Sequence, residues 1–232
     1  MQASGQKFIY AHNERSQVSS TQSAVKTEPR LSLFTLYNME PYIEILGVIT
    51  GVVYLWLEYR ASIYLWIAGV IMPAIYIYIY YNAGLYADFA INIYYLLIAL
   101  YGWVAWKTGF SLFKKEKTKG ELPISHTPQG AIPYIIAAYL TAQLSIAWIL
   151  IEYTDSTVPW ADSFTTALSI LGMWMLARKY IEQWWVWCIV DIACCVLYIY
   201  KGLHLTAILY AVYAIIAIFG YYKWKKLMQN ER

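Results

Sequence analysis

Residues 86–107 read YADFAINIYYLLIALYGWVAWK, and residues 204–225 read HLTAILYAVYAIIAIFGYYKWK. Each stretch is almost wholly apolar, and its few charged residues lie toward its ends. A helix rises 1.5 Å per residue, so about 20 apolar residues cross the roughly 30 Å hydrocarbon core of a bilayer. Lipid offers the backbone no hydrogen-bond partners, and we therefore predict that each stretch is a transmembrane helix.

The two stretches also align with one another, without a gap, at an offset of 118. The rare residues Trp and Gly coincide too often at this single offset for chance similarity between two Tyr-rich segments. The same offset, with no gap, joins Trp56 to Trp174, Arg60 to Arg178, Trp66 to Trp184, Tyr80 to Tyr198, Gly84 to Gly202, Leu85 to Leu203, Tyr95 to Tyr213, Ile98 to Ile216, Gly102 to Gly220, Trp106 to Trp224 and Lys107 to Lys225.

The whole chain has the composition of a membrane protein. Hydrophobic residues make up 60% of it and charged residues only 13%, whereas a soluble domain carries about 25% charged residues. Seven apolar segments are long enough to cross a bilayer or nearly so: Tyr42–Leu57, Ile63–Tyr80, Tyr86–Trp106, Ala131–Ile151, Ala161–Ala177, Ile181–Tyr200 and Leu203–Tyr222.

The repeat organises these segments into an all-α integral membrane fold. Three helices before the fourth segment match three helices after it, so we expect two three-helix repeats joined by one linker helix. An odd linker gives both repeats the same orientation in the membrane, a design found in secondary transporters. The expected divisions are a polar tail (1–40), the first repeat (41–107), a basic loop with the linker helix (108–160), the second repeat (161–226) and a short C-terminal tail (227–232).

The positive charges predict the orientation of the chain. With seven spans, 12 of the 17 Lys and Arg residues collect on one side, which includes the loop residues Lys114–Lys119 and the C-terminus. Cytoplasmic loops carry the excess of Lys and Arg, so we expect an external N-terminus and a cytoplasmic C-terminus.

Asp191 is the residue most indicative of function, because it lies in the middle of the sixth segment. An ionisable group at this depth costs a few kcal/mol on insertion scales and marks a functional site by default. Trp184, Trp187 and Asp191 share one helical face by their spacing. An aromatic face with one carboxylate suits a flat, positively charged ring. The alternative is that Asp191 only joins neighbouring helices.

Asn92 and Tyr95 form a second candidate pair on the third segment. They are three residues apart and share a face, and a buried amide can either orient a polar ligand or bond to a neighbouring helix. We therefore predict a substrate site formed by Trp184, Trp187, Asp191, Asn92 and Tyr95.

Other classes of protein are less consistent with the sequence. H-E-x-x-H and G-x-S-x-G motifs are absent, and Asp191 is the single deep aspartate, which argues against an intramembrane protease. The histidines are scattered and predict no metal site, and no cofactor is expected. A receptor that binds without transport remains an open alternative to a small-molecule transporter.

Two motifs resemble a known family. The stretch from Gly84-Leu85-Tyr86-Ala87 to Tyr101-Gly102-Trp103-Val104-Ala105-Trp106 and the stretch Ala177–Trp187 (ARKYIEQWWVW) are similar to the Pnu family of bacterial vitamin transporters. The resemblance covers about residues 41–226, apart from the central loop and the fourth span.

This resemblance implies a SWEET-like arrangement of three plus one plus three helices, a homotrimer in the bacterial inner membrane, and facilitated diffusion. It implies uptake of nicotinamide riboside by alternating access, with intracellular phosphorylation trapping the vitamin. Riboside transporters tend to carry asparagine at the position of Asp191 and glutamine at that of Asn92. Thiamine, which also has a cationic ring, is therefore the alternative substrate.

Overall fold

The computed structural model describes residues 51–82, 86–109, 121–154, 156–200, 202 and 204–230, and these ranges are helical with no β-strand. The expected N-terminal tail, the start of the first span, Gly84, Leu85 and the lysines of the basic loop lie outside the described residues. The division of the chain into two tails, two repeats and a linker region, as expected from the sequence, remains a prediction.

The helices begin and end close to the predicted segments. Residues 51–59 are helical and belong to the first segment. They are followed by α3 (Leu65–Asn82), α4 (Tyr86–Thr108), a 3₁₀ turn η1 (Gln129–Ala131), α5 (Ile132–Tyr153), α6 (Pro159–Ala177), α7 (Gln183–Tyr200) and α8 (His204–Asn230). Proline in the first turn starts α5 and α6, where its missing N–H costs nothing. The helix α8 extends past the predicted end at Tyr222, beyond the apolar part of the segment.

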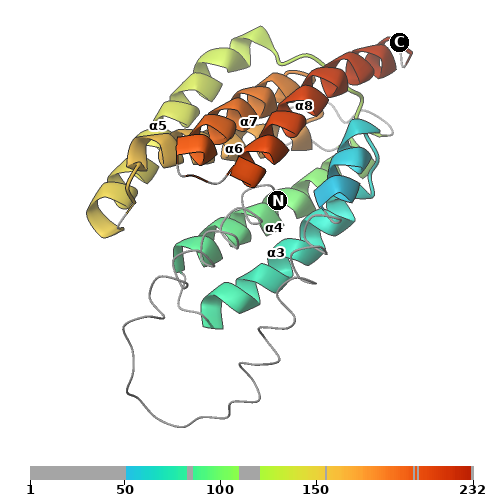
Figure 1. Cartoon of the computed structure of the whole chain (residues 1–232). Helices are drawn as coiled ribbons and strands as arrows, with labels where there is room; N and C mark the ends of the chain where they lie inside the picture. Colours follow the sequence, from blue (N-terminus) through green and yellow to red (C-terminus); the bar gives the residue numbers. More distant parts are fainter. Residues whose placement is uncertain are drawn as a thin grey trace, which may run out of the picture.

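Figure 1 shows two groups of helices. The α3–α4 hairpin packs through α4 against α6, and α6 also contacts α5 and α7, while α7 pairs with α8. The helix α6 is therefore central. Its buried residues include Ser163, Thr165 and Ser169, whose hydroxyls bond to carbonyls of the same helix.

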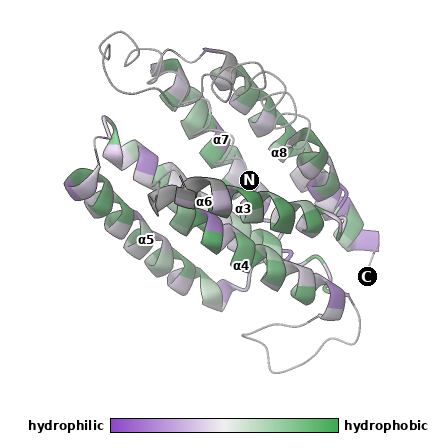
Figure 2. Cartoon of the chain, turned by 90° about the horizontal axis from the view of Figure 1, so that it is seen from below, coloured by the Kyte–Doolittle hydropathy of each residue, from purple (hydrophilic) through white to green (hydrophobic). Residues whose placement is uncertain are grey.

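Many large apolar side chains are exposed on the helices, and the ribbons in Figure 2 are largely green, the colour of hydrophobic residues. Four helices in the described part of the chain are long and apolar enough to cross a membrane: Phe89–Thr108, Gln129–Tyr153, Gln183–Tyr200 and Thr206–Asn230. An apolar exterior of this extent is expected for a protein that is solvated by lipid. The central helix α6 is less apolar because other helices, and not lipid, surround it.

The turn before α3 is built like the turn before α7. Ala61 and Lys179, which are 118 residues apart, both adopt the left-handed conformation, with φ of 51° and 52°. The backbone bond from Ser62 N to Leu57 O is repeated, at the same offset, by the bond from Tyr180 N to Met175 O. A non-glycine residue in this conformation is uncommon, so the two turns share a specific local structure.

Each turn leads to a tryptophan that fills a notch made by glycine. Trp66 packs on Gly102 and meets Trp106 edge-on at 5.5 Å between ring centroids. Trp184 packs on Gly220 and meets Trp224 edge-on at 5.8 Å. These aromatic geometries are favourable. The same wedge thus occurs twice, with every residue shifted by 118.

Two hydrogen bonds then connect these wedges crosswise. The indole Nε1 of Trp106 donates to the Leu176 carbonyl at 3.2 Å, and Nε1 of Trp224 donates to the Glu58 carbonyl at 3.0 Å. Positions 58 and 176 are again 118 apart. Each half therefore donates to the equivalent carbonyl of the other half.

A connecting segment, residues 121–128, lies against the turn between α6 and α7. Ser125 and Tyr180 form a parallel bridge, with bonds from Ser125 N to Lys179 O and from Ile181 N to Ser125 O. Glu182 accepts hydrogen bonds from the backbone N and hydroxyl of Thr127, both at 2.8 Å, and lies 2.6 Å from Nδ1 of His126. Partial burial acts to raise the pKa of Glu182, but the bonds from His126 and Thr127 outweigh it, and the pKa is lowered.

Glycine at the notches is required because a methyl group has no room there. A Cβ on Gly102 would lie 2.4 Å from the Trp66 ring, and one on Gly220 would lie 2.6 Å from Trp184. We expect Gly102→Ala and Gly220→Ala each to cost about 1–3 kcal/mol, measured as a lower Tm in detergent. Gly130→Ala is the control, because nothing lies within 4 Å of its added Cβ. If all three variants melt together, the notches do not restrain the fold.

Glu182 should hold the connecting segment in place. Glu182→Ala is expected to speed amide hydrogen exchange several-fold at Ser125, Thr127 and Ile181, while the exposed Glu152→Ala leaves these amides unchanged. Since the pKa of Glu182 is lowered, its contribution is present at neutral pH and is lost as the pH falls through that lowered value. Equal exchange in both variants would contradict the assignment.

Candidate functional site

A small cavity lies where the first half of the chain meets the second. Its lining comes from four segments: Tyr54, Leu55 and Glu58 from helix 51–59, Met173 from α6, Trp184, Trp187 and Asp191 from α7, and Tyr213 and Ala217 from α8. The cavity volume is about 10 Å³, which is room for about one water molecule. In this conformation the site is closed.

Three of the predicted residues meet in this cavity. Asp191, Trp184 and Trp187 are 1%, 1% and 7% exposed. Within the described ranges, the Asp191 Oδ1 atom and the indole nitrogens of Trp184 and Trp187 have no hydrogen-bond partner. Buried polar atoms are almost always paired with protein or water, so these three groups are available to a ligand or to water.

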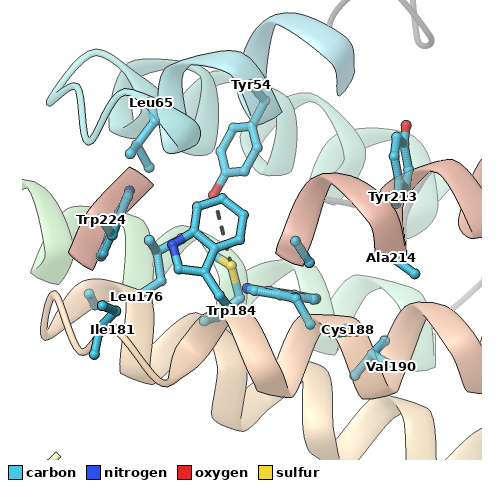
Figure 3. Close-up of a cluster of buried hydrophobic side chains, with 14 of the residues drawn as sticks. Tyr54, Leu65, Leu176, Ile181, Trp184, Cys188, Val190, Tyr213, Ala214 and Trp224 are labelled. Atoms are coloured by element: carbon cyan, nitrogen blue, oxygen red, sulfur yellow. Dashed lines mark hydrogen bonds between the residues drawn. The ribbon is translucent and has the colours of Figure 1, made fainter. Parts of the chain in front are cut away.

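The two tryptophans have different surroundings. Trp184 is wedged on Gly220 and against Trp224, and Figure 3 shows it beneath Tyr54. Trp187 instead lies against Gly172, whose added Cβ would be 3.1 Å from its ring. Trp184 thus holds the second half together, while Trp187 is the ring better placed to pack against a ligand.

The opposite wall comes from the first half of the chain. The Tyr54 hydroxyl donates to the Met173 sulfur at 3.9 Å, drawn as a dashed line in Figure 3. Glu58, which is 4% exposed, lines the same wall. The cavity therefore has contributions from both halves, as a site between repeats requires.

Asn92 and Tyr95 are not among the lining residues, although Tyr95 is close enough to the lining residue Tyr54 to interact with it electrostatically. Both are buried on α4 at 2% exposure, but neither lines the cavity. The Tyr95 ring packs on Tyr94, whose hydroxyl donates to the Ile170 carbonyl of α6 at 2.7 Å. Tyr213, the counterpart of Tyr95 at the 118 offset, reaches the cavity instead.

Sequence reasoning missed Glu58 and Tyr213. Glu58 stands next to Tyr59 and Arg60 at the end of an apolar segment, where a charged residue is expected to reach water. The structure buries it because Trp224 bonds to its carbonyl and draws the helix end into the protein. Glu58 follows Tyr54 by four residues, and residues at this spacing share a helical face. This spacing was the one signal in the sequence that could have placed Glu58 beside Tyr54.

The charge of the lining favours a cation. Two carboxyls, Glu58 and Asp191, are close enough to interact electrostatically, and no Lys or Arg is among the lining residues. Four aromatic side chains, Tyr54, Trp184, Trp187 and Tyr213, accompany them. A positively charged flat ring would satisfy the carboxyls by charge and the rings by stacking and cation–π attraction. The described residues contain no cluster of three potential metal ligands.

Known proteins that are similar to this chain include vitamin transporters. The chain is 24% identical over 202 residues to the nicotinamide riboside transporter PnuC of Escherichia coli (strain K12), covering 79% of this chain and 84% of that protein. It is 25% identical over 130 residues to the riboflavin/roseoflavin transporter RibM of Streptomyces davaonensis, covering 56% of this chain and 59% of that protein.

A solved structure has a similar fold. The crystal structure of the vitamin B3 transporter PnuC superposes with a TM-score of 0.61 at 20% identity, covering 87% of this chain and 88% of that one. These relatives are transporters and not enzymes. The family model described as nicotinamide mononucleotide transporter matches residues 41–226, and the chain therefore belongs to the nicotinamide mononucleotide transporter family.

Proposed function

We propose that this protein takes up a vitamin that carries a cationic aromatic ring, with nicotinamide riboside as the first candidate and thiamine as the second. The observation that carries the proposal is Asp191, buried beside Trp187 in a cavity between the two halves. Trp184, Trp187 and Asp191 are the proposed substrate-binding residues. Asn92 and Tyr95 would contact the substrate only if a conformational change during transport moves α4 toward the cavity.

The cavity favours a cation over the neutral ring of riboflavin. A buried carboxylate costs free energy unless it is paired, and nicotinamide riboside and thiamine each bring a positive charge that can pair with it. A flavin brings none. The similarity to RibM makes riboflavin the appropriate comparison ligand.

The proposed architecture is seven spans in two parallel repeats, three plus one plus three, with alternating access to the cavity. The repeated turns, glycine notches and crosswise indole bonds support it. The closed cavity supports a mechanism in which the halves separate to admit the vitamin, since it holds about one water molecule.

The remaining parts of the proposal rest on charge distribution and family resemblance. The excess of Lys and Arg supports an inner-membrane orientation with the N-terminus outside. Facilitated diffusion followed by intracellular phosphorylation, and assembly as a homotrimer, follow from the resemblance. The helix α5 buries only Ala147 among its described side chains, which leaves its apolar surface for lipid or for another copy.

Removing the charge of Asp191 tests the substrate class. Asn keeps the size of the side chain, so Asp191→Asn should lose about 1.5–3 kcal/mol of charge-assisted binding, or about ten- to a hundredfold in affinity for the cationic vitamin. Isothermal titration would measure this with nicotinamide riboside, thiamine and riboflavin. Asp162→Asn is the matched control, since Asp162 accepts a bond from Ser156 and lies outside the cavity.

Unchanged affinity for both cations in a folded Asp191→Asn variant would mean that Asp191 only joins helices. Preferential binding of riboflavin by the wild type would assign the protein to the flavin branch instead.

Reporter fusions test the orientation. A reporter that is active only in the cytoplasm should give signal when fused after Arg232, because the excess of Lys and Arg lies on that side. A silent fusion there, together with an active periplasmic reporter at the same position, would contradict the seven-span topology.

A further inference from the structure

The 118-residue repeat provides an internal comparison for every cavity residue. Residues that are needed for the packing of each half, which we call the frame, should occur in both halves. Trp66 and Trp184 are such a pair, because each packs on the equivalent glycine of its own half. Residues needed for a ligand have no reason to be repeated when the cavity is single and asymmetric.

Four cavity residues differ from their counterparts in chemistry. Tyr54 corresponds to Gly172, Glu58 to Leu176, Trp187 to Gly69, and Asp191 to Pro73. Both carboxyls of the cavity are therefore departures from the repeat, one contributed by each half.

Glu58 is the more informative of the two carboxyl residues, because the role of its backbone in packing can be distinguished from the role of its side chain. Its carbonyl accepts the indole bond of Trp224 at 3.0 Å, and the carbonyl of Leu176 accepts the equivalent bond of Trp106 at 3.2 Å. Leu176 performs this role with an apolar side chain that is 0% exposed. The frame thus requires a backbone carbonyl at this position and does not require a carboxyl.

The Glu58 side chain nevertheless is 4% exposed and lines the cavity. Its carboxyl lies beside the neutral amide of Gln183, which stands where the other half has Leu65. This partner offsets part of the cost of burying a carboxyl, but it does not offset the repulsion that a second carboxyl beside Asp191 adds whenever both are ionised. A cation in the cavity would offset that repulsion.

We propose that Glu58 is a specificity-determining residue, which acts with Asp191 from the opposite half to select a vitamin that has both a cationic ring and a separate hydrogen-bond donor. This rests on the proposed function. Glu58 pairs with the ring charge, while Asp191 adds its charge to the same site and accepts from an amide or amino N–H. Nicotinamide riboside has a carboxamide and thiamine has an aminopyrimidine, so both candidates meet this requirement.

The test replaces Glu58 by Gln, which keeps the shape, and by Leu, which the repeat already accommodates at position 176. Binding of nicotinamide riboside, thiamine and riboflavin is measured by isothermal titration on the full-length protein, together with the uncharged reduced form of nicotinamide riboside. Leu176→Gln is the matched control, and Tm in detergent checks folding.

We expect Glu58→Gln and Glu58→Leu to weaken binding of the cation about ten- to a hundredfold and to weaken binding of the reduced, uncharged form much less. The double variant Glu58→Gln/Asp191→Asn should lose less than the product of the single losses, because both side chains contact one ligand. Both Glu58 variants should keep the wild-type Tm within a few degrees.

The outcomes separate the two proposals. If Asp191→Asn loses the cation and both Glu58 variants bind it normally, the role of Glu58 is wrong and the proposed function stands. If the wild type binds neither cation, the proposed function fails. If Glu58→Gln loses charged and uncharged forms equally, Glu58 is structural and the inference is overturned.

Discussion

The arrangement of this protein depends on two indole hydrogen bonds that cross between its halves. Trp106 and Trp224 are 1% and 0% exposed, and a buried indole N–H without an acceptor is costly. Each finds its acceptor at the helix end of the other half, at Leu176 and Glu58. The halves are thus held at one end by a contact that neither can satisfy alone.

This contact also positions the cavity. The same carbonyl that receives the Trp224 bond belongs to Glu58, whose side chain lines the cavity together with Trp184, itself in edge contact with Trp224. A change in how the halves meet at the tryptophans therefore moves one cavity wall against the other. Since the closed cavity accommodates about one water molecule, any larger molecule could enter it only after such a movement.

The fold was largely predictable from the sequence, because apolar length and rare-residue matches are strong signals. The helices α3 to α8 lie where the apolar segments predicted them, and the pairing of Trp66 and Trp184 at the 118 offset reappears as two equivalent wedges. The site was only partly predictable. Spacing along one helix places Trp187 and Asp191 on one face, but it does not say which neighbour that face meets.

That limit explains why the predicted site and the cavity differ. Asn92 and Tyr95 do share a face and are buried, but neither is among the residues that line the cavity. Glu58 was overlooked because a carboxylate at the end of an apolar segment is ordinarily solvated. In each case the missing information was the contact between helices, which depends on residues far away in sequence.

Comparison of the two halves recovers part of that missing information. The same packing arrangement occurs in both halves, so packing accounts for the presence of a residue that is found in both, such as Trp184 with Trp66. A residue that is costly to bury and lacks an equivalent, such as Asp191 opposite Pro73 or Glu58 opposite Leu176, is not explained by packing. The asymmetry between otherwise matching halves therefore identifies the residues whose burial is not accounted for by the packing that the two halves share.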